Sequence, residues 1–408
     1  MTEAVFWSAV GLIAYTYLGF PLLVLARGAL RPRPVAVGDG EPRISVLVAA
    51  HDEALSIGRK LENLLGLDYP ADRLEIVVAS DGSGDGTDAI VRELAGAQHG
   101  RQIHLLSLPR QGKAPALTAA AEVAEGDVLV FSDANSMFAP DALRKLVGPF
   151  ADPSVGGVAG DQRYLSGAGD GSAAGERSYW SLDRALKVAE SRGGNVISAT
   201  GAIYAIRREL FRPVLPGVTD DFYTSTGVIA QGRRLVFAAD AAAYEPVAPS
   251  SGIEFGRKVR VITRGLRGVL ARRQLLDPFR HGFYAVQLVS HKVLRRLMFV
   301  PLAAMLATSA LLWSDGPFWV ALTSAQAALY GAGLAGIALG GTRVGRSKLL
   351  ALPAFFCLAN AACAAAVWNI ARGRRIELWQ PERDARPPAA GVELPAGGAG
   401  RPSEGSSR

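Results

Sequence analysis

The sequence has only two cysteines among its 408 residues, Cys357 and Cys363, and both lie in one long apolar segment. Their position and spacing exclude a disulfide framework and a CxxC metal site, so we interpret them as small apolar residues. The glycine-rich segment 81–86 lacks the Lys-Ser/Thr of a P-loop and the GxGxxG spacing of a dinucleotide site. These absences leave other kinds of nucleotide site open.

Charge is missing from residues 5–26, about the length that a helix needs to cross the hydrocarbon core of a membrane. The flanking residues, Glu3 before it and arginines after it, do not resemble those of a cleaved signal peptide. We therefore predict a retained anchor over residues 1–30. Three more apolar stretches predict a C-terminal membrane region over 297–371, with spans at about 297–313, 317–340 and 349–371.

The basic residues beside these spans predict a multi-pass protein of the cell membrane, with residues 31 to about 295 in the cytoplasm. The final span does not fit this rule, because Arg372, Arg374 and Arg375 would then lie outside. Either that segment lies shallowly or the rule is overridden there. The two asparagines within it, Asn360 and Asn369, make it the weakest of the predicted spans.

The formal net charge of +7 could indicate a nucleic-acid partner, but much of it comes from arginines next to the spans. Attraction to anionic lipid is the simpler explanation, and we expect no nucleic-acid binding. Basic and apolar residues alternate at helical spacing over 251–276 and again over 283–296. This pattern predicts amphipathic helices at the membrane interface within 251–296. The segment 386–408 has almost no large apolar residue and is predicted to be disordered.

Between the anchor and the interface helices, residues 40–250 alternate strand and helix patterns. Apolar strands are predicted at 44–49, 74–79, 103–106 and 127–132, with helices at 54–67, at 86–95 and after Pro115. Apolar strands joined by helices are typical of an α/β fold with a mostly parallel sheet covered on both faces. Ligands of such folds bind at the carboxyl ends of the strands.

Acidic residues follow three of these strands, as Glu53, Asp81 and Asp133. Because a buried, unpaired carboxylate is costly, these side chains should face a cation, hydroxyl groups or a base. Asp85 and Asp88 fit better as helix caps or Asx turns, which favour aspartate. A phosphate at this edge of the sheet would need neutralising groups, and the chain offers Arg110, Lys113 and a divalent ion at Asp133.

The motifs AxHDE, DGSGDGTD, GKAPAL, FSDAN and VTDDF occur in this order, before a basic RKVR stretch and the last spans. This order resembles the processive-type family 2 glycosyltransferases, membrane polymerases related to cellulose, hyaluronan and poly-N-acetylglucosamine synthases, from about residue 5 to 371. The resemblance implies a GT-A fold and a nucleotide-sugar donor, usually a UDP-sugar. It also implies transfer with inversion at the anomeric carbon to a glycan or lipid-linked acceptor at the membrane, for synthesis of a cell-surface polysaccharide or glycolipid.

The resemblance also implies roles for donor-binding residues. Glu53 and Asp81 match residues that contact uracil and ribose, and Lys113 matches a residue on the diphosphate side. Asp133 matches the first acid of a DxD element, which binds the diphosphate together with Mg²⁺ or Mn²⁺. Asn135 stands where the second acid usually lies, and its amide oxygen can still bind a hard cation without adding charge.

For the acceptor side, the segment 219–221 resembles the TED element, which makes Asp221 the expected general base, with Asp220 beside it. Asp221 could also be the N-cap of a helix starting near Phe222, and the two roles are compatible. Trp180 is either an acceptor-side sugar platform or a core residue.

The QxxRW element of the family is altered, because Arg257 replaces the glutamine and Val261 the tryptophan. Arg260 can still pair with a diphosphate. The missing tryptophan removes a stacking platform, which puts processive synthesis in doubt but not transfer itself.

Two alternatives to a transferase follow from the sequence. A dehalogenase-like phosphatase also uses an aspartate loop in an α/β sheet, but residues 51–54 lack its DxDx[TV] nucleophile motif. A membrane-anchored nucleotide sensor or transport component is the second alternative. Transport would need paired ionisable residues within the spans, and the sequence has none there. Release of a nucleoside diphosphate separates the transferase from the sensor.

Overall fold

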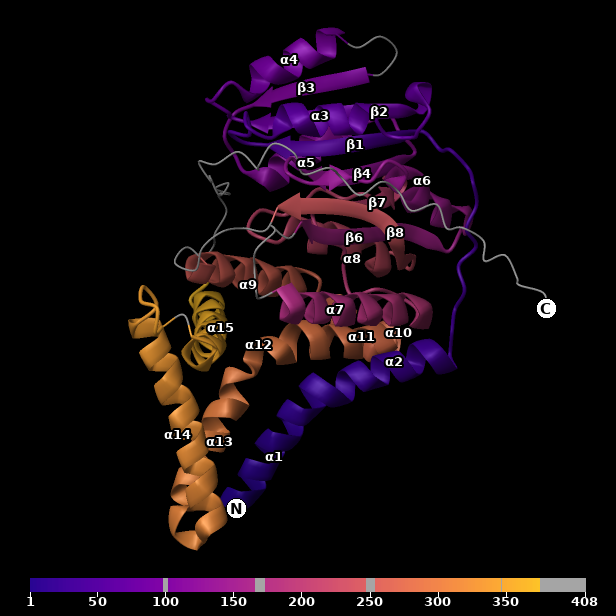
Figure 1. The fold of residues 1–408 in the computed structure, drawn as a ribbon. Helices are drawn as coiled ribbons and strands as arrows, with labels where there is room; N and C mark the ends of the chain where they lie inside the picture. The colour runs from indigo at the N-terminus through magenta and orange to yellow at the C-terminus, as the bar shows by residue number, and fades with distance from the viewer. Residues whose placement is uncertain (98–101, 166–172, 247–253, 346, 375–408) are drawn as a thin grey trace, which may run out of the picture.

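The structure is a computed structural model that describes residues 1–97, 102–165, 173–246, 254–345 and 347–374. Its centre is an eight-stranded sheet with the order β3-β2-β1-β4-β7-β6-β8-β5 (Figure 1). Most neighbouring strands are parallel, and helices cover both faces. The predicted α/β fold class is confirmed, and the arrangement is that of a GT-A domain.

Four parallel strands form one half of the sheet. They are β1 (Ile44–Ala50), β2 (Leu74–Asp81), β3 (Gln102–Leu108) and β4 (Val128–Asp133). β1 and β2 are buried along their whole length, as their continuous apolar sequences predict. Ala49 pairs with both Ala79 and Asp133 across the sheet. The loops after β1, β2 and β4 therefore begin at one edge.

The other half of the sheet is mixed. Its strands are β5 (Met137–Phe138), β6 (Val155–Leu165), β7 (Tyr204–Arg207) and β8 (Arg234–Pro246). β7 is antiparallel to both β4 and β6, whereas β6 and β8 are parallel. Two antiparallel steps, from β4 to β7 and from β7 to β6, make β6 run in the same direction as β4, and β8 is parallel to β6. The carboxyl end of β8 therefore lies at the same edge of the sheet as the end of β4.

Two apolar layers enclose the sheet. The helices of this domain are α3 (Ile57–Leu65), α4 (Thr87–Ala97), α5 (Lys113–Val123), α6 (Ala142–Val147), α7 (Ala173–Gly193) and α8 (Asp220–Ala230). α3, α4 and α6 contribute to the core on one face, while α5 and α8 contribute to the core on the other. α5 begins at Lys113, earlier than predicted, because Pro115 lies within its first turn, where a proline costs no hydrogen bond.

The apolar helices are α1 (Thr2–Ala14), α2 (Phe20–Leu30), α13 (Phe299–Leu311), α14 (Pro317–Ala338) and α15 (Lys348–Ala371). Three helical segments are long and apolar enough to cross a membrane, namely Thr2–Leu30, α14 and α15. The stretch predicted as a span at 297–313 forms α13, which has only 13 residues. α13 reaches the length of a span only together with Phe283–Leu297, to which it is bent by 52°.

Further helices join these segments to the sheet domain. They are α9 (Glu254–Ala271), α10 (Pro278–His281), α11 (Phe283–Leu288) and α12 (Arg295–Leu297). Helical turns of the π type occur at Tyr15–Gly19 and Val289–Leu294, and a 2.8 Å hydrogen bond between Tyr15 Oη and Ser290 Oγ joins them. The amphipathic helix predicted from 251 is described from Glu254 onward, and 251–253 and the tail at 386–408 lie outside the described residues.

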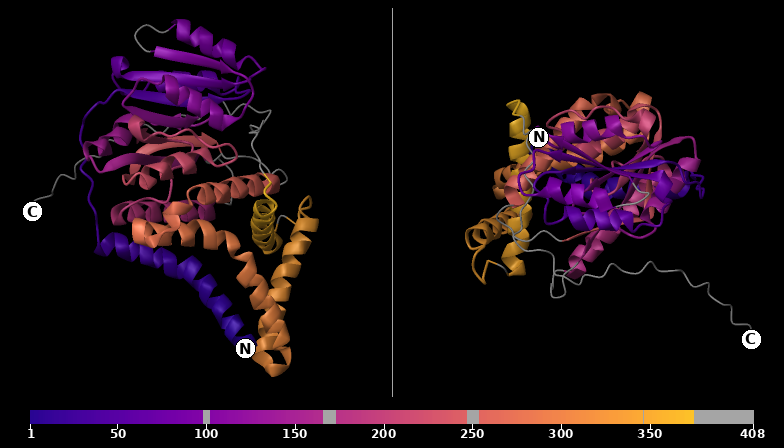
Figure 2. Two further views of the ribbon diagram at one scale, coloured as in Figure 1. Left: turned by 180° about the vertical axis from the view of Figure 1, so that it is seen from behind. Right: turned by 90° about the horizontal axis from the view of Figure 1, so that it is seen from above.

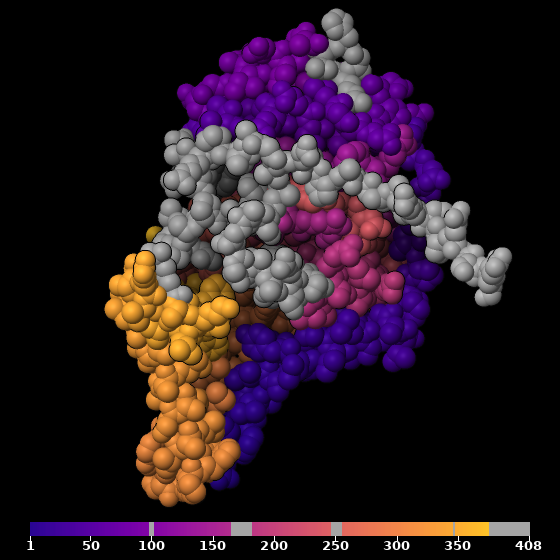
Figure 3. All heavy atoms as spheres, in the orientation of Figure 1, coloured from indigo at the N-terminus to yellow at the C-terminus, as the bar shows by residue number. Residues whose placement is uncertain are grey.

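The apolar helices extend away from the sheet domain on one side. α1, α13 and α14 run together to the tip of a wedge, where the N-terminus lies (Figures 1 and 2). Phe6, Leu312 and Trp319 pack together at this tip. α15 does not follow α14 toward the tip and remains beside α9. The space-filling view shows the same wedge projecting below the domain (Figure 3).

Candidate active site

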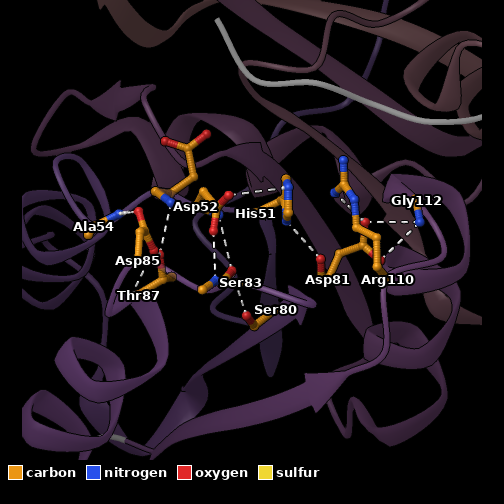
Figure 4. Close-up of polar contacts among 12 residues, drawn as sticks. His51, Asp52, Ala54, Ser80, Asp81, Ser83, Asp85, Thr87, Arg110 and Gly112 are labelled. Carbon is orange, nitrogen blue, oxygen red and sulfur yellow. Dashed lines mark hydrogen bonds and ion pairs between the residues drawn. The ribbon is translucent and has the colours of Figure 1, made fainter. Parts of the chain in front are cut away.

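The loops after β1 and β2 are bonded to each other (Figure 4). The Gly84 amide donates to Asp52 Oδ1 (2.7 Å), and the Asp52 amide donates to Ser83 Oγ (3.1 Å). His51 Nδ1 lies 2.8 Å from the Asp81 carbonyl oxygen. Asp52 has a positive φ of 55°, which aspartate tolerates better than most residues. These hydrogen bonds fix the backbone of the loop after β1, and thereby the position of Glu53 in that loop.

Asp85 is a structural residue, as predicted. Its carboxylate accepts hydrogen bonds from the Ala54 amide (3.0 Å) and from the amide and hydroxyl of Thr87 (3.1 and 2.6 Å). It therefore caps the start of α4 and ties it to the β1 loop. Asp88, in the first turn of α4, accepts from Ser107 Oγ (2.5 Å) on β3. These hydrogen bonds within the protein explain the positions of both carboxylates, so no bound ligand is needed to account for either one.

Asp81 is only 1% exposed, and protein groups already surround its carboxylate. It accepts hydrogen bonds from Arg110 Nη1 (2.8 Å), the Gln111 amide (2.6 Å) and the Gly112 amide (2.9 Å) (Figure 4). Gly82 allows this turn, because its φ is 65° and a Cβ there would lie 2.9 Å from the Arg110 nitrogen. Asp81 thus positions the loop that leads into α5, and Arg110 faces Asp81 in this structure.

Glu53 lies close enough to Asp133 to be affected by its charge. Burial raises the pKa of Glu53, the negative charge of Asp133 raises it further, and a hydrogen bond from Ser56 Oγ (2.5 Å) partly opposes the increase. The predicted donor-binding residues Glu53 and Asp133 therefore interact electrostatically, although about 80 residues separate them in the chain.

Lys113 connects two predicted acidic elements. Its Nζ lies 2.6 Å from Asp133 Oδ1 and 3.0 Å from Asp220 Oδ2. Burial alone would lower the pKa of Lys113, but the two carboxylates outweigh that effect and raise it. The lysine therefore stays charged and holds the GKAPAL, FSDAN and VTDDF motifs at one place.

The two aspartates that begin α8 have different environments. Thr219 is the N-cap of this helix, so the interpretation of Asp221 as the N-cap is wrong. Burial opposes ionisation of Asp220, but Lys113 and Arg264 outweigh it and lower its pKa. Burial and the neighbouring charge of Asp220 raise the pKa of Asp221 to about 6. The pair therefore provides an ionised partner for Lys113 and a carboxylate that can accept a proton near neutral pH.

On α9, the arginine that contacts this region is Arg264. It is buried, and its Nε and Nη2 donate to the Val218 carbonyl (3.0 and 2.7 Å) next to the start of α8. Arg260 is half-buried, and no contact in the described part of the chain joins it to Asp133, Asp220 or Asp221. Arg264 follows Arg260 by four residues, and residues at this spacing lie on the same face of a helix. The helical period was therefore a signal in the sequence that could have indicated Arg264.

Two further charged residues, which the sequence analysis missed, support the loop after β4. The buried Lys60 Nζ donates to Ser132 Oγ (2.8 Å) and to the Ser136 carbonyl. Glu245, near the end of β8, accepts from Ser136 Oγ and from Gln162 Nε2 (2.6 Å). Burial and the charge of Asp133 raise the pKa of Glu245. Nothing in the sequence near Glu245 indicates this role, because it depends on how β8 pairs with β6.

The oxygen ligands at the end of β4 suit a divalent ion that shares its coordination with a substrate. The side chain of Asp133 is 33% exposed, and Asn135 is exposed beside it. The described residues contain no group of three or more His, Cys, Asp or Glu that could hold a metal by themselves. Mg²⁺ and Mn²⁺ commonly bind through one or two protein oxygens plus substrate phosphates, so these residues fit such an ion.

Comparisons with known proteins agree with this geometry. Residues 45–215 match the family described as glycosyl transferase family 2. A probable glycosyltransferase of Bacillus subtilis is 35% identical over 130 residues, which are 31% of each chain. An N-acetylglucosaminyltransferase of Rhizobium meliloti is 31% identical over 43% of this chain and 41% of its own length.

A β-monoglucosyldiacylglycerol synthase of Synechocystis is 33% identical over 31% of this chain and 27% of its own length. The matches thus span less than half the length of these curated relatives. A solved structure is similar over more of the chain. It is a mannosyltransferase from Pyrobaculum calidifontis in complex with GDP-Man and Mn²⁺, with a TM-score of 0.66 and 27% identity, covering 90% of this chain and 98% of that one.

Proposed function

Residues 45–215 match glycosyltransferase family 2, and from that match we propose that this chain transfers a sugar from a nucleotide-sugar donor to an acceptor hydroxyl with inversion. The observation that carries the proposal is the convergence of Lys113, Asp133, Asp220 and Asp221 at the carboxyl ends of the strands. Three separate motifs contribute to this group, and each supplies a different chemical function.

In the proposed reaction, Asp221 takes the proton of the acceptor hydroxyl. The acceptor oxygen attacks the anomeric carbon while the bond between that carbon and the diphosphate oxygen breaks. Transfer in a single displacement inverts the configuration. Lys113 supplies positive charge where the diphosphate departs, and Asp220 positions Lys113 and keeps it charged.

The nucleoside of the donor would contact Glu53 and the loop that the buried Asp81 positions. The diphosphate would contact Lys113, Arg257 and Arg260. Asp133 and Asn135 would hold Mg²⁺ or Mn²⁺. When bound, the ion neutralises charge on the leaving diphosphate. Trp180 and Asp220 belong to the proposed acceptor side, although the side chain of Trp180 lies outside the described residues.

We expect a UDP-sugar donor from the motifs, and the GDP-Man in the mannosyltransferase structure makes GDP-mannose the alternative to test. The acceptor would be a glycan or a lipid-linked group for polysaccharide or glycolipid synthesis. Relatives named for N-acetylglucosamine transfer and for glucosyldiacylglycerol synthesis support these two classes. The apolar helices would hold the catalytic domain on the cytoplasmic face of the membrane in a multi-pass arrangement.

The test is a donor screen on membranes containing the full chain, with UDP-glucose, UDP-N-acetylglucosamine and GDP-mannose supplied separately with Mn²⁺. We expect release of the nucleoside diphosphate from one donor, and mass spectrometry of the product identifies the acceptor and its length. Asp133→Ala and Asp221→Asn should abolish most of this release. The matched control is Asp88→Asn, which removes a carboxylate outside the site. Unchanged turnover in both site variants would overturn the assigned roles.

A further inference from the structure

Two cavities adjoin each other away from the catalytic residues. The first, of about 370 Å³, lies between α2 and α7 and is lined mainly by apolar groups, including Leu25, Ala29 and Ala185. The two helices meet closely beside it, because a Cβ on Gly28 would lie 2.6 Å from the Ala189 carbonyl oxygen. Its apolar wall therefore continues from a membrane helix onto the sheet domain.

The second cavity, of about 760 Å³, lies beneath the linker from Arg33 to Asp39, and its lining mixes apolar groups with charged side chains of both signs. Because the charged side chains distinguish it from the first, we call it the polar cavity. Val188 and Arg192 line both cavities, so the apolar and polar spaces meet at these two residues. A ligand that fills both must have an apolar part and a polar part.

Positive charge gathers where the two cavities meet. The Arg33 amide donates to the Arg192 carbonyl (2.7 Å), which holds the linker against the end of α7. Both arginines line the polar cavity, and the side chain of Arg192 is exposed. An anion at this junction would be attracted by both guanidinium groups.

The rest of the polar lining determines what kind of anion fits. Arg144, which also lines this cavity, is paired with Glu41 and with Asp68 (2.9 Å), so its charge is already balanced. Asp39 and Asp141 line the same cavity and can accept hydrogen bonds from hydroxyl groups. The lining therefore suits a phosphate near Arg33 and Arg192 and hydroxyl groups near the two acids.

The paired cavities are separate from the active site. Residues 236–240, in the first half of β8, line the polar cavity, whereas Glu245 of the active site lies near the end of that strand. From this separation and the lining chemistry, we propose that the paired cavities bind one phosphatidylglycerol-type lipid. An acyl chain lies between α2 and α7, the phosphate lies beside Arg33 and Arg192, and the glycerol headgroup faces the acids.

The test uses the purified full chain in nanodiscs containing either phosphatidylglycerol or phosphatidylcholine, followed by transfer to detergent and native mass spectrometry. We expect the wild-type chain to retain one phosphatidylglycerol and no phosphatidylcholine. The double variant Arg33→Gln/Arg192→Gln should reduce retention about tenfold by removing both charges at the phosphate. Ala185→Phe, which fills the apolar cavity, should also reduce retention.

Arg31→Gln is the matched control, because it removes a neighbouring exposed arginine that lines neither cavity. We expect this variant to retain the lipid like the wild type. An equal loss in Arg31→Gln would show nonspecific surface attraction and overturn the proposal, as would equal retention of phosphatidylcholine. Release of nucleoside diphosphate from the donor monitors folding of each variant, so a lipid-binding defect is distinguished from loss of structure.

Discussion

Asp221 has a raised pKa, whereas the pKa of its neighbour Asp220 is lowered. Its pKa is raised to about 6 by burial and by Asp220, while Lys113 and Lys292 act in the opposite direction. A general base works only when deprotonated, so kcat/KM should fall below about pH 6 and decrease roughly tenfold for each further pH unit. A pH profile measured by nucleoside diphosphate release checks this. Asp221→Asn should lower turnover by about 10² to 10⁴-fold.

Asp220→Asn provides a control for this assignment. Removing the negative charge beside Asp221 should lower its pKa and move the acidic limb of the profile to lower pH. The same variant weakens the hold on Lys113, so overall turnover should fall as well. An acidic limb that stays at the same pH in Asp220→Asn would mean that a different group titrates.

Asn135 replaces the usual second acid, and its effect on metal binding can be measured directly. Because Asn135→Asp adds a negative charge at an exposed position near Asp133, it should tighten Mn²⁺ binding by about tenfold. Titration of free Mn²⁺ by electron paramagnetic resonance measures this without turnover. Asp141→Asn, which alters a carboxylate away from the site, should leave Mn²⁺ binding unchanged. An unaltered affinity in Asn135→Asp would place residue 135 outside the coordination shell.

Among the elements, α9 connects the apolar helix α15 to the acids of the candidate site. The sequence motif indicated Arg260, but the structure places Arg264 against the Val218 carbonyl and close to Asp220. The guanidinium of Arg264 donates two hydrogen bonds to the Val218 carbonyl, and a lysine at this position can make only one. Arg264→Lys should therefore reduce kcat by about tenfold, the effect of losing one charge-assisted hydrogen bond. Arg260→Lys is the matched comparison. A larger effect at Arg260 would favour the motif over the observed geometry.

The sequence was most informative for elements with a strong local pattern. The continuous apolar strands β1, β2 and β4 and the acids that follow them could be predicted, because the parallel arrangement places their ends at one edge. Contacts that depend on the packing of elements far apart in the sequence could not be predicted. Lys60 reaches the β4 loop only because α3 packs over it, and Glu245 arrives through the pairing of β8 with β6. The bend before α13 was missed because hydropathy alone does not detect it.

For the whole molecule, the position of α15 explains the basic residues that follow it. α15 contacts α9 along much of its length. Lys258 lies over the Phe355 ring (5.0 Å), Ile262 packs with Ala362 and Ala366, and Arg267 donates to the Arg374 carbonyl (3.3 Å). In Figures 1 and 2, α15 stays beside α9 while α14 extends away from the domain. A helix held in this way should lie along the membrane interface with both ends on the catalytic side.

This arrangement predicts which side of the membrane each end of α15 faces. In a variant with Cys357 and Cys363 replaced by alanine, new cysteines in Ser347→Cys and Gly373→Cys should both react with an impermeant maleimide only when the cytoplasmic face is open. Thr2→Cys, near the wedge tip, should react from the opposite face and serves as the control. If Gly373→Cys instead reacts from the same face as Thr2→Cys, α15 crosses the membrane. Labelling on the cytoplasmic side would leave Arg372 and Arg374 on the side that basic residues favour, so the positive-inside rule would hold for the whole chain.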